Sequence, residues 1–270
     1  MKEHSNSQAD EQSRHLERIR DEFARQAEAF SLAPAVVECG SIPHFLEAVG
    51  NRDGRQRVLE VGCGPGLLAE HLAPLVEEYL GIDATPEMVE LASQRLHSSV
   101  NASFKLSIAE NLPCDAASFD IVVTRLTLHH LPRPEKALVE AHRVLAPGGR
   151  LFLADILTSE DPQAAKLHNA LERLRDPTHV RMLTRAEMVS QLEEAGFHIL
   201  ENASWEHSRS FEEWAAIVAD PMRVEPLATV MQALAQSDQT AGIQLRQSGD
   251  GLRFVHNWYF CAAQSLNGSA

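Results

Sequence analysis

VLEVGCGPG, residues 58–66, begins as a short apolar strand and ends as a loop with glycine at positions 62, 64 and 66. Glycine lets the backbone turn sharply there and lets a ligand lie against bare N–H groups. Pro65 suits the first turn of a following helix, where its missing N–H would be unbonded anyway. Leucines then recur at helical spacing, at Leu67, Leu68, Leu72 and Leu75. The stretch predicts a strand, a ligand-binding loop and a helix.

Strand and helix signals alternate on both sides of this loop. The first five strands are expected at 58–61, 79–82, 102–108, 119–124 and 150–155, and two more at 197–203 and 252–262. Residues 119–124 form a continuous β-branched run, which is typical of a strand buried on both faces of a parallel sheet. The pattern predicts an α/β fold with a doubly wound, seven-stranded, mostly parallel sheet of Rossmann-like type and helical cap insertions.

The chain divides by pattern into four segments. We expect an N-terminal helical lid segment at 1–50, a Rossmann-like core at 51–204, a helical cap insertion at 205–251, and the last strand with the tail at 252–270. The lid helix itself is expected at 14–30. The cap insertion leaves the sheet at the carboxyl ends of its strands, where doubly wound folds bind ligands. The two helical segments are therefore predicted to form a movable cover, with a merely stabilising cap as the alternative.

Composition excludes several classes of protein. The 270 residues carry 24 Lys plus Arg against 38 Asp plus Glu, for a formal net charge of −14. Such a charge disfavours binding to nucleic acid and docking on anionic lipid. The four cysteines form no CxxC pair, and the N-terminus has no apolar leader run. We expect a cytoplasmic monomer or homodimer with no metal site, no nucleic acid partner and no membrane partner.

An acid after the second strand narrows the ligand class. Asp83 stands 21 residues beyond Gly62, at the position where a doubly wound fold bonds a ribose diol. A dinucleotide loop requires a small third residue, but Leu67 is bulky, and no Gly-Lys-Ser/Thr of a phosphate-binding loop follows. These features favour a nucleoside without phosphates, such as S-adenosylmethionine.

Six motifs in order carry a family resemblance: VLEVGCGPG, GID at 81–83, AENLP at 109–113, SFDIVVTR at 118–125, LHHLPRPEKAL at 128–138 and RVLAPGG at 143–149. Over about residues 20–200 the chain resembles class I S-adenosylmethionine-dependent methyltransferases, and most closely the type 11 group related to ubiquinone and menaquinone C-methyltransferases. The resemblance implies a small-molecule acceptor and the product S-adenosyl-L-homocysteine. The asparagine-containing motifs of the quinone enzymes are absent after the fourth strand, which argues against quinone precursors as acceptors.

The same resemblance implies a cofactor site built from successive strand ends. Gly62, Cys63 and Gly64 would lie along the methionine and ribose, and Asp83 would bond the ribose hydroxyls. Four residues would surround the adenine: Ala84, Met88, Ala109 and Glu110. Arg125 would receive the cofactor's amino group on its backbone carbonyl. Two aromatic residues of the lid helix would cover the site: Phe23 and Phe30.

Candidate catalytic residues follow the central strands. Methyl transfer from a sulfonium is a displacement, and a base is needed only if the acceptor must lose a proton. We predict His130 as that base and Asp155 in a catalytic or substrate-binding role. Three further residues are predicted to face the acceptor: His129, His179 and Arg181. The alternatives are that the histidine pair only shapes the cofactor pocket and that residues 175–181 form a solvated loop.

The sequence therefore predicts a methyltransferase, with C-, O- and N-methylation all open. A non-catalytic protein that binds S-adenosylmethionine or its product remains an alternative. So does an enzyme of the same fold that does not transfer a methyl group. Turnover against a panel of acceptors separates the methyltransferase from the non-catalytic protein, since both would bind the cofactor.

Overall fold

A computed structural model describes residues 2–33, 40–50, 52–218, 220–237 and 239–266. Its sheet has the strand order β3-β2-β1-β4-β5-β8-β6, and the first five strands are parallel. Their bounds are β1 Arg57–Val61, β2 Glu78–Asp83, β3 Ala102–Leu106, β4 Phe119–Arg125 and β5 Leu145–Leu157. The order reverses between β1 and β4, so the loops after these two strands diverge and open a crevice at their carboxyl ends.

The other strands close the sheet in the opposite sense. β8 (Gly251–Ser265) is antiparallel to both β5 and β6 (Phe197–Ser210), and β7 (Arg246–Ser248) pairs with β8. The predicted doubly wound, mostly parallel sheet is confirmed. The sheet contains eight strands where seven were expected, because β7 forms a short hairpin with the start of β8.

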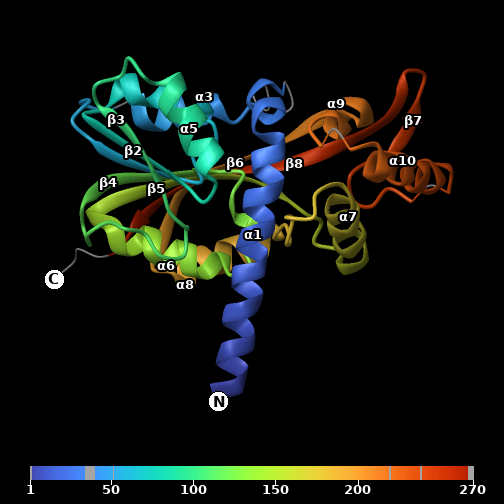
Figure 1. Ribbon diagram of the computed structural model, residues 1–270, viewed down its shortest axis with the longest axis horizontal. Helices are drawn as coiled ribbons and strands as arrows, with labels where there is room; N and C mark the ends of the chain where they lie inside the picture. Colours follow the sequence, from blue (N-terminus) through green and yellow to red (C-terminus); the bar gives the residue numbers. More distant parts are fainter. Residues whose placement is uncertain (1, 34–39, 51, 219, 238, 267–270) are drawn as a thin grey trace.

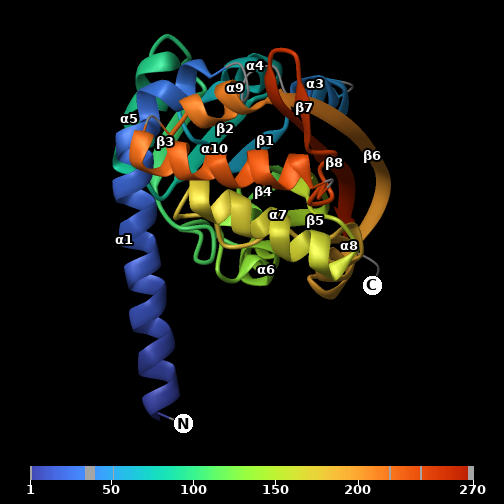
Figure 2. The same cartoon turned by 90° about the vertical axis from the view of Figure 1, so that its right-hand side faces the viewer.

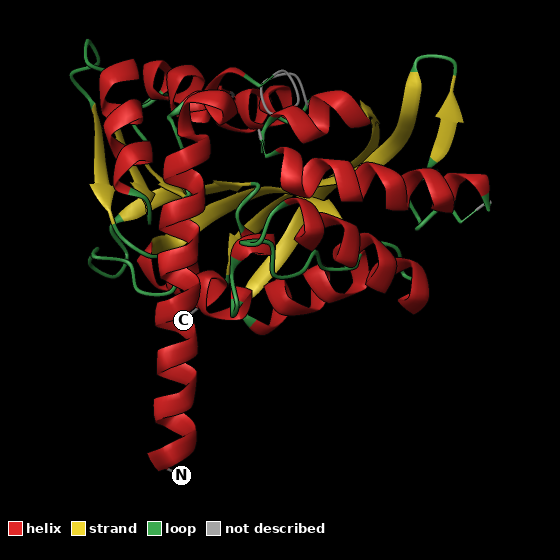
Figure 3. Ribbon diagram, turned by 45° about the vertical axis from the view of Figure 1, so that its right-hand side comes forward, coloured by secondary structure: helices red, strands yellow, loops and turns green. Residues whose placement is uncertain are grey.

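Helices cover both faces of the sheet (Figures 1 and 3). One face carries α3 (Ile42–Gly50), α4 (Leu67–Leu72) and α5 (Pro86–Arg95). The opposite face carries α6 (Pro134–Val144) and α8 (Arg185–Glu194). Successive strand residues serve the two layers, since side chains alternate along a strand. Two separate apolar cores result.

A third core lies beneath the cap. It is formed by α7 (Pro162–Arg175), α9 (Phe211–Ala216), α10 (Pro221–Gln236) and the β7–β8 hairpin. The stretch 205–251, expected as a helical insertion, thus contains the helices α9 and α10. Residues 205–210, however, continue β6, because the long β8 provides a pairing partner as far as Ser210↔Arg253.

The N-terminal helix α1 (Lys2–Leu32) crosses the carboxyl edge of the sheet, and its first turns project from the body (Figures 1 and 2). Arg20 donates to the carbonyl of Ala84 in the core at 3.0 Å. Arg25 donates to the carbonyl of Val218, beyond α9, at 2.7 Å. The helix therefore contacts both the core and the cap.

The apolarity of the helices and the state of the cysteines bear on whether the described chain has membrane spans or disulfides. Across the described ranges, no helix combines the length and apolarity needed to cross a bilayer. Cys63, Cys114 and Cys261 are free thiols, and Cys39 lies outside the described residues.

Candidate active site

A cavity of about 450 Å³ lies at the carboxyl ends of β1, β2 and β4, under α1. It collects nearly all the residues that the sequence singled out. Fourteen of them line it: Phe23, Phe30, Gly62, Cys63, Gly64, Asp83, Ala84, Met88, Ala109, Glu110, Arg125, His129, His130 and His179. Asp155 and Arg181 are not among the lining residues.

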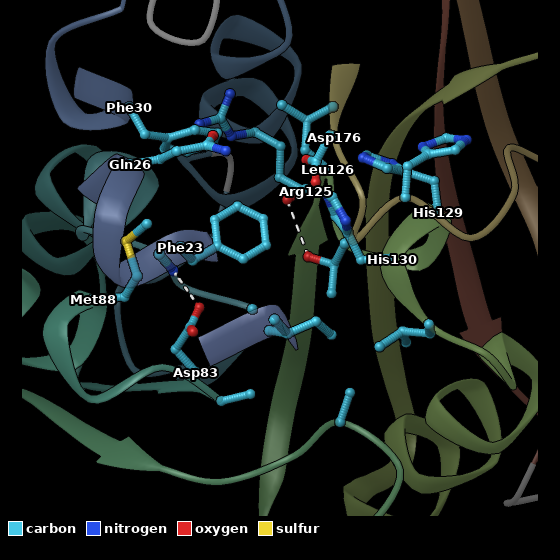
Figure 4. Close-up of a pocket in the computed structure, with 18 of the residues that line it drawn as sticks. Phe23, Gln26, Phe30, Asp83, Met88, Arg125, Leu126, His129, His130 and Asp176 are labelled. Carbon is cyan, nitrogen blue, oxygen red and sulfur yellow. Dashed lines mark hydrogen bonds between the residues drawn. The ribbon is translucent and has the colours of Figure 1, made fainter. Parts of the chain in front are cut away.

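The part of the cavity lined by residues 60–64, 82–88 and 107–110 is called the glycine-loop end. Gly62 has φ +73°, and a Cβ there would lie 2.3 Å from Oγ1 of Thr127, so only glycine fits. Gly64 has φ +51° and open space where a Cβ would be. The Asp83 carboxylate, labelled in Figure 4, accepts the Gly64 N–H at 2.9 Å, and it also accepts the Thr85 N–H at 2.9 Å. The acid at the end of β2 thus holds the loop against β2.

Acidic groups at this end resist ionisation. Burial raises the pKa of Glu60 to about 8, although Tyr79 donates to its carboxylate at 2.6 Å. Burial also raises the pKa of Asp83 and of Glu110. The Cys63 thiol has its pKa raised by burial as well, so it supplies no thiolate. A cation bound here would relieve the cost of ionising these carboxyls.

The second part of the cavity is the histidine end, lined by His129, His130, Asp176 and His179. His129 donates from Nδ1 to Oδ1 of Asp155 at 2.6 Å, and Asp155 also accepts the backbone N–H groups of Leu128 and Ile156. Burial lowers the pKa of His129, but the charge and hydrogen bond of Asp155 outweigh it, so the net shift is upward. Asp155 therefore stands behind His129 and orients it.

His130 is held at three points. Its Nδ1 lies 3.1 Å from Oγ1 of Thr178, and its backbone carbonyl accepts from Nε2 of His15 at 2.8 Å. Its ring packs edge-on against Phe23, with centroids 5.0 Å apart. Burial and the charge of His129 lower the pKa of His130 to about 4. The ring is thus neutral at physiological pH, with Nε2 left for a ligand in the cavity (Figure 4).

The two remaining predicted residues, His179 and Arg181, lie in different places: one lines the cavity and the other is at the surface. His179 donates from Nε2 to Oδ1 of Asn169 at 2.9 Å, and burial together with His129 lowers its pKa to about 2. Arg181 is exposed, and its guanidinium lies 2.7 Å from both carboxylate oxygens of Glu187 on α8. The structure brings His179 to the cavity and leaves Arg181 outside it.

Two residues that the sequence did not single out, Glu172 and His256, close the far side of the cavity next to the cap, together with Arg175 from the predicted polar stretch 175–181. Glu172 accepts from Nε2 of His256 at 3.0 Å and from Nε of Arg175 at 3.2 Å. Arg175 also lies over the ring of Trp214, 4.9 Å from its centroid. Glu172 and Arg175 share one face of α7 at a spacing of three residues, which is a usable sequence signal. His256 comes from β8, and no local pattern announces it.

One group of side chains has the composition of a metal site. His168, Glu172 and His256 are buried, and their ligand atoms lie within 4.8 Å of one another. Arg209 donates from Nε to Nδ1 of His256 at 3.4 Å, which places the ring proton on Nε2, the nitrogen facing Glu172. A metal would have to displace that proton, and it would lie beside the guanidinium of Arg175. The arrangement is that of an ion-pair network, and we assign no metal to it.

Comparison with known proteins agrees with this architecture. The sequence profile described as "Methyltransferase domain" matches residues 59–153. The "Uncharacterized methyltransferase YcgJ" of Bacillus subtilis is 32% identical over 236 residues, which is 86% of this chain and 93% of the relative. The crystal structure of the YcgJ protein has a TM-score of 0.78 at 28% identity, covering 84% of this chain and 99% of that one.

A second relative matches a shorter region. A ubiquinone biosynthesis O-methyltransferase of Xanthomonas oryzae pv. oryzae is 41% identical over 104 residues, which is 37% of this chain and 43% of the relative. That match spans less than half of either protein. The full-length similarity to YcgJ, the methyltransferase profile and the shared fold together show that the chain belongs to the class I S-adenosylmethionine-dependent methyltransferases.

Proposed function

We propose that the protein transfers a methyl group from S-adenosylmethionine to a hydroxyl of a small-molecule acceptor. The observation that carries this proposal is the continuity of the cavity, which contains both the glycine-loop end and the histidine end. Phe23 lies between them, with its ring against His130 (Figure 4). A cofactor at one end and an acceptor at the other would therefore meet beside this histidine.

The residues present fit the cofactor. The bare backbone at Gly64 borders open space, as close approach of a ligand requires. Asp83 keeps unused lone pairs beyond its two backbone contacts, so it can accept from ribose hydroxyls. Ala84, Met88, Ala109 and Glu110 line the same end and would surround the adenine. When bound, S-adenosylmethionine supplies a methyl group activated by a positively charged sulfur.

His130 is the proposed base. Its ring is neutral, lines the cavity and leaves Nε2 free to accept the proton of an acceptor hydroxyl. An amine already carries a free lone pair at its reacting nitrogen when deprotonated, whereas a hydroxyl gains most from a base held within hydrogen-bonding distance. A phenol or enol therefore suits this end of the cavity better than an aliphatic amine.

The neighbouring groups support that role. Asp155 holds His129 beside His130, with ring centroids 4.2 Å apart. Burial and the positive charge on His129 lower the pKa of His130, so the His130 ring stays unprotonated and its lone pair stays available, while its affinity for a proton falls. His179 and the residues beside the cap, Arg175 and Trp214, form the proposed acceptor wall. Arg181 is left out of this proposal, because Glu187 holds it at the surface.

The test has two parts. Calorimetry with S-adenosylhomocysteine should show binding to the purified protein. Incubation with methyl-labelled S-adenosylmethionine and a panel of phenols, enols and amines should then label a hydroxyl-bearing acceptor. Binding with no labelled product from any acceptor would favour a non-catalytic cofactor-binding protein. Conversion of an acceptor without release of S-adenosylhomocysteine would favour an enzyme that does not transfer methyl.

A further inference from the structure

The turn after α7 contains a short chain of hydrogen bonds that ends on the ring of His130. Oδ1 of Asp176 accepts the hydroxyl proton of Thr178 at 2.6 Å and the backbone N–H of Thr178 at 2.8 Å. Oγ1 of Thr178 in turn lies 3.1 Å from Nδ1 of His130. Asp176 and Thr178 are buried, at 3% and 0% exposure, so bulk water does not compete for these contacts.

The direction of each bond in this chain is fixed. An ionised carboxylate only accepts, so the Thr178 hydroxyl must donate its single proton to Asp176. The same oxygen can then only accept from His130, which requires the ring proton to be on Nδ1. A neutral imidazole with a proton on Nδ1 has an unprotonated Nε2. Without the carboxylate, Thr178 would be free to donate to Nδ1, and Nε2 would carry the proton and point a donor into the cavity.

We infer that Asp176 is a positioning residue for methyl transfer, because through the Thr178 hydroxyl it fixes His130 in the tautomer whose Nε2 accepts a proton. This inference rests on the proposed role of His130 as the base. Asp176 does not touch the acceptor proton itself. It corresponds in function to the carboxylate that orients a catalytic histidine directly, with a hydroxyl placed between the two groups.

Two other contacts fix the position of His130 but leave open which of its ring nitrogens carries the proton. The backbone of His130 is held by His15 on α1, and its ring packs in a T-shaped arrangement with Phe23. These contacts fix where the ring lies but not which nitrogen is protonated. Among the described residues, Thr178 is the one that contacts a ring nitrogen of His130, through its hydroxyl at 3.1 Å and through its backbone, whose hydrogen bond partly offsets the lowering of the ring's pKa by burial. Loss of the hydroxyl contact should therefore change the protonation pattern without moving the ring far.

Long-range ¹H–¹⁵N correlation spectra of the protein labelled with ¹⁵N-histidine measure this pattern directly and need no ligand. The His130 signals are assigned by their absence in His130→Gln. The unaltered protein should show a single Nδ1–H tautomer. Thr178→Ser keeps the hydroxyl and should keep that tautomer, whereas Thr178→Val and Asp176→Ala should lose the single tautomer. Near-ultraviolet circular dichroism confirms that each variant is folded.

The outcomes separate the inference from the proposed function. An Nε2–H tautomer in the unaltered protein, or an unchanged tautomer in folded Thr178→Val and Asp176→Ala, would overturn the inference. If His130→Gln methylates the acceptor at full rate while the tautomer does follow Thr178 and Asp176, the base assignment fails and the control of the tautomer by Asp176 stands.

Discussion

The two ends of the cavity are built in opposite ways. The glycine-loop end comes from the neighbouring strands β1, β2 and β3 and the loops directly after them, within residues 60–110. The histidine end and its far wall are assembled from η2 (Leu128–His130), β5, α7 with the turn after it, and β8. The first is a local motif that the chain carries as a unit. The second exists only once the sheet and the cap are folded against each other.

The two ends also respond to protons in opposite senses. Burial makes the carboxyl of Glu60 hold its proton, with a pKa of about 8. Burial lowers the pKa of the His256 imidazole to about 4, even though its hydrogen bond to Glu172 favours the protonated form. The glycine-loop end is thus suited to a cationic ligand, whereas His130 and His179 at the histidine end, and His256 beside it, stay neutral because burial lowers the pKa of each ring.

The largest expected effect is on the pH dependence of the free energy of unfolding, to which Glu60 and His256 should contribute with opposite signs. Glu60 stabilises the fold below its unfolded pKa of about 4.5, and that contribution is lost as pH rises toward about 8. His256 stabilises the fold above about pH 6.5, and that contribution is lost as pH falls toward about 4. Between its unfolded and folded pKa, each group changes the free energy of unfolding by about 1.4 kcal/mol per pH unit: Glu60 lowers it as pH rises, and His256 raises it.

Denaturant unfolding between about pH 5 and pH 6.5 measures the two terms. Relative to the unaltered protein, Glu60→Gln should steepen the rise of unfolding free energy with pH, and His256→Gln should flatten it. Each slope should change by about 1.4 kcal/mol per pH unit. Equal slopes in both variants would contradict the opposition of the two ends.

The next effect concerns catalysis at the histidine end alone. His130→Gln removes the proposed base and should lower kcat by roughly 100-fold or more. Affinity for S-adenosylhomocysteine should stay unchanged, because the glycine-loop end is untouched. The matched control is His97→Gln, which alters an exposed histidine that does not line the cavity. Full turnover of His130→Gln would mean that the histidine only shapes the pocket.

The sequence predicted the glycine-loop end better than the histidine end. Strand order, the glycine loop and Asp83 were predictable, because hydrophobic periodicity and glycine spacing are local signals. The pairing of Asp155 with His129 was not, since adjacent histidines differ only in which way each side chain leaves the η2 turn. Glu172 and His256 meet across 84 residues, and only the folded cap brings them together.

Strand lengths were less predictable than strand order. β6 extends through Ser210 because β8 is long enough to pair with it, a tertiary effect that overrides the polar character of residues 206–210. Arg181 illustrates the same limit at a single residue. His179 and Met182 line the cavity on either side of it in sequence, but Glu187 at the start of α8 holds Arg181 outside.

A smaller effect is expected for ligand binding at the glycine-loop end. Asp83→Ala removes charge-assisted hydrogen bonds to the ribose, each worth on the order of 1.5–3 kcal/mol, and should weaken S-adenosylhomocysteine binding at least about tenfold. Calorimetry is the measurement, with thermal unfolding to verify the fold. Asp115→Ala, which alters an exposed carboxylate outside the cavity lining, is the control. Unchanged affinity in folded Asp83→Ala would remove this residue from the proposed cofactor site.

The smallest effect concerns the helix that spans both ends. Glu22 on α1 is buried and accepts from Arg223 on α10 at 2.7 Å, as well as from Arg25 and Gln26. If α1 and the cap form a movable cover, Arg223→Ala should ease its opening. The other two donors still satisfy Glu22, so the cost should be about 1 kcal/mol, or roughly a fivefold change in the opening equilibrium.

Amide hydrogen exchange measures that opening. Residues 14–30 should exchange roughly fivefold faster in Arg223→Ala than in the unaltered protein, because the loss of one ion pair shifts the open population by that factor. Arg246→Ala, an exposed arginine on β7, should leave exchange unchanged. Adding S-adenosylhomocysteine should slow exchange in residues 14–30, since the lining residues Phe23 and Phe30 come from this helix. Equal amide protection of residues 14–30 with and without ligand would show instead that α1 is rigidly packed across both ends of the cavity and does not open. An acceptor would then enter by another route.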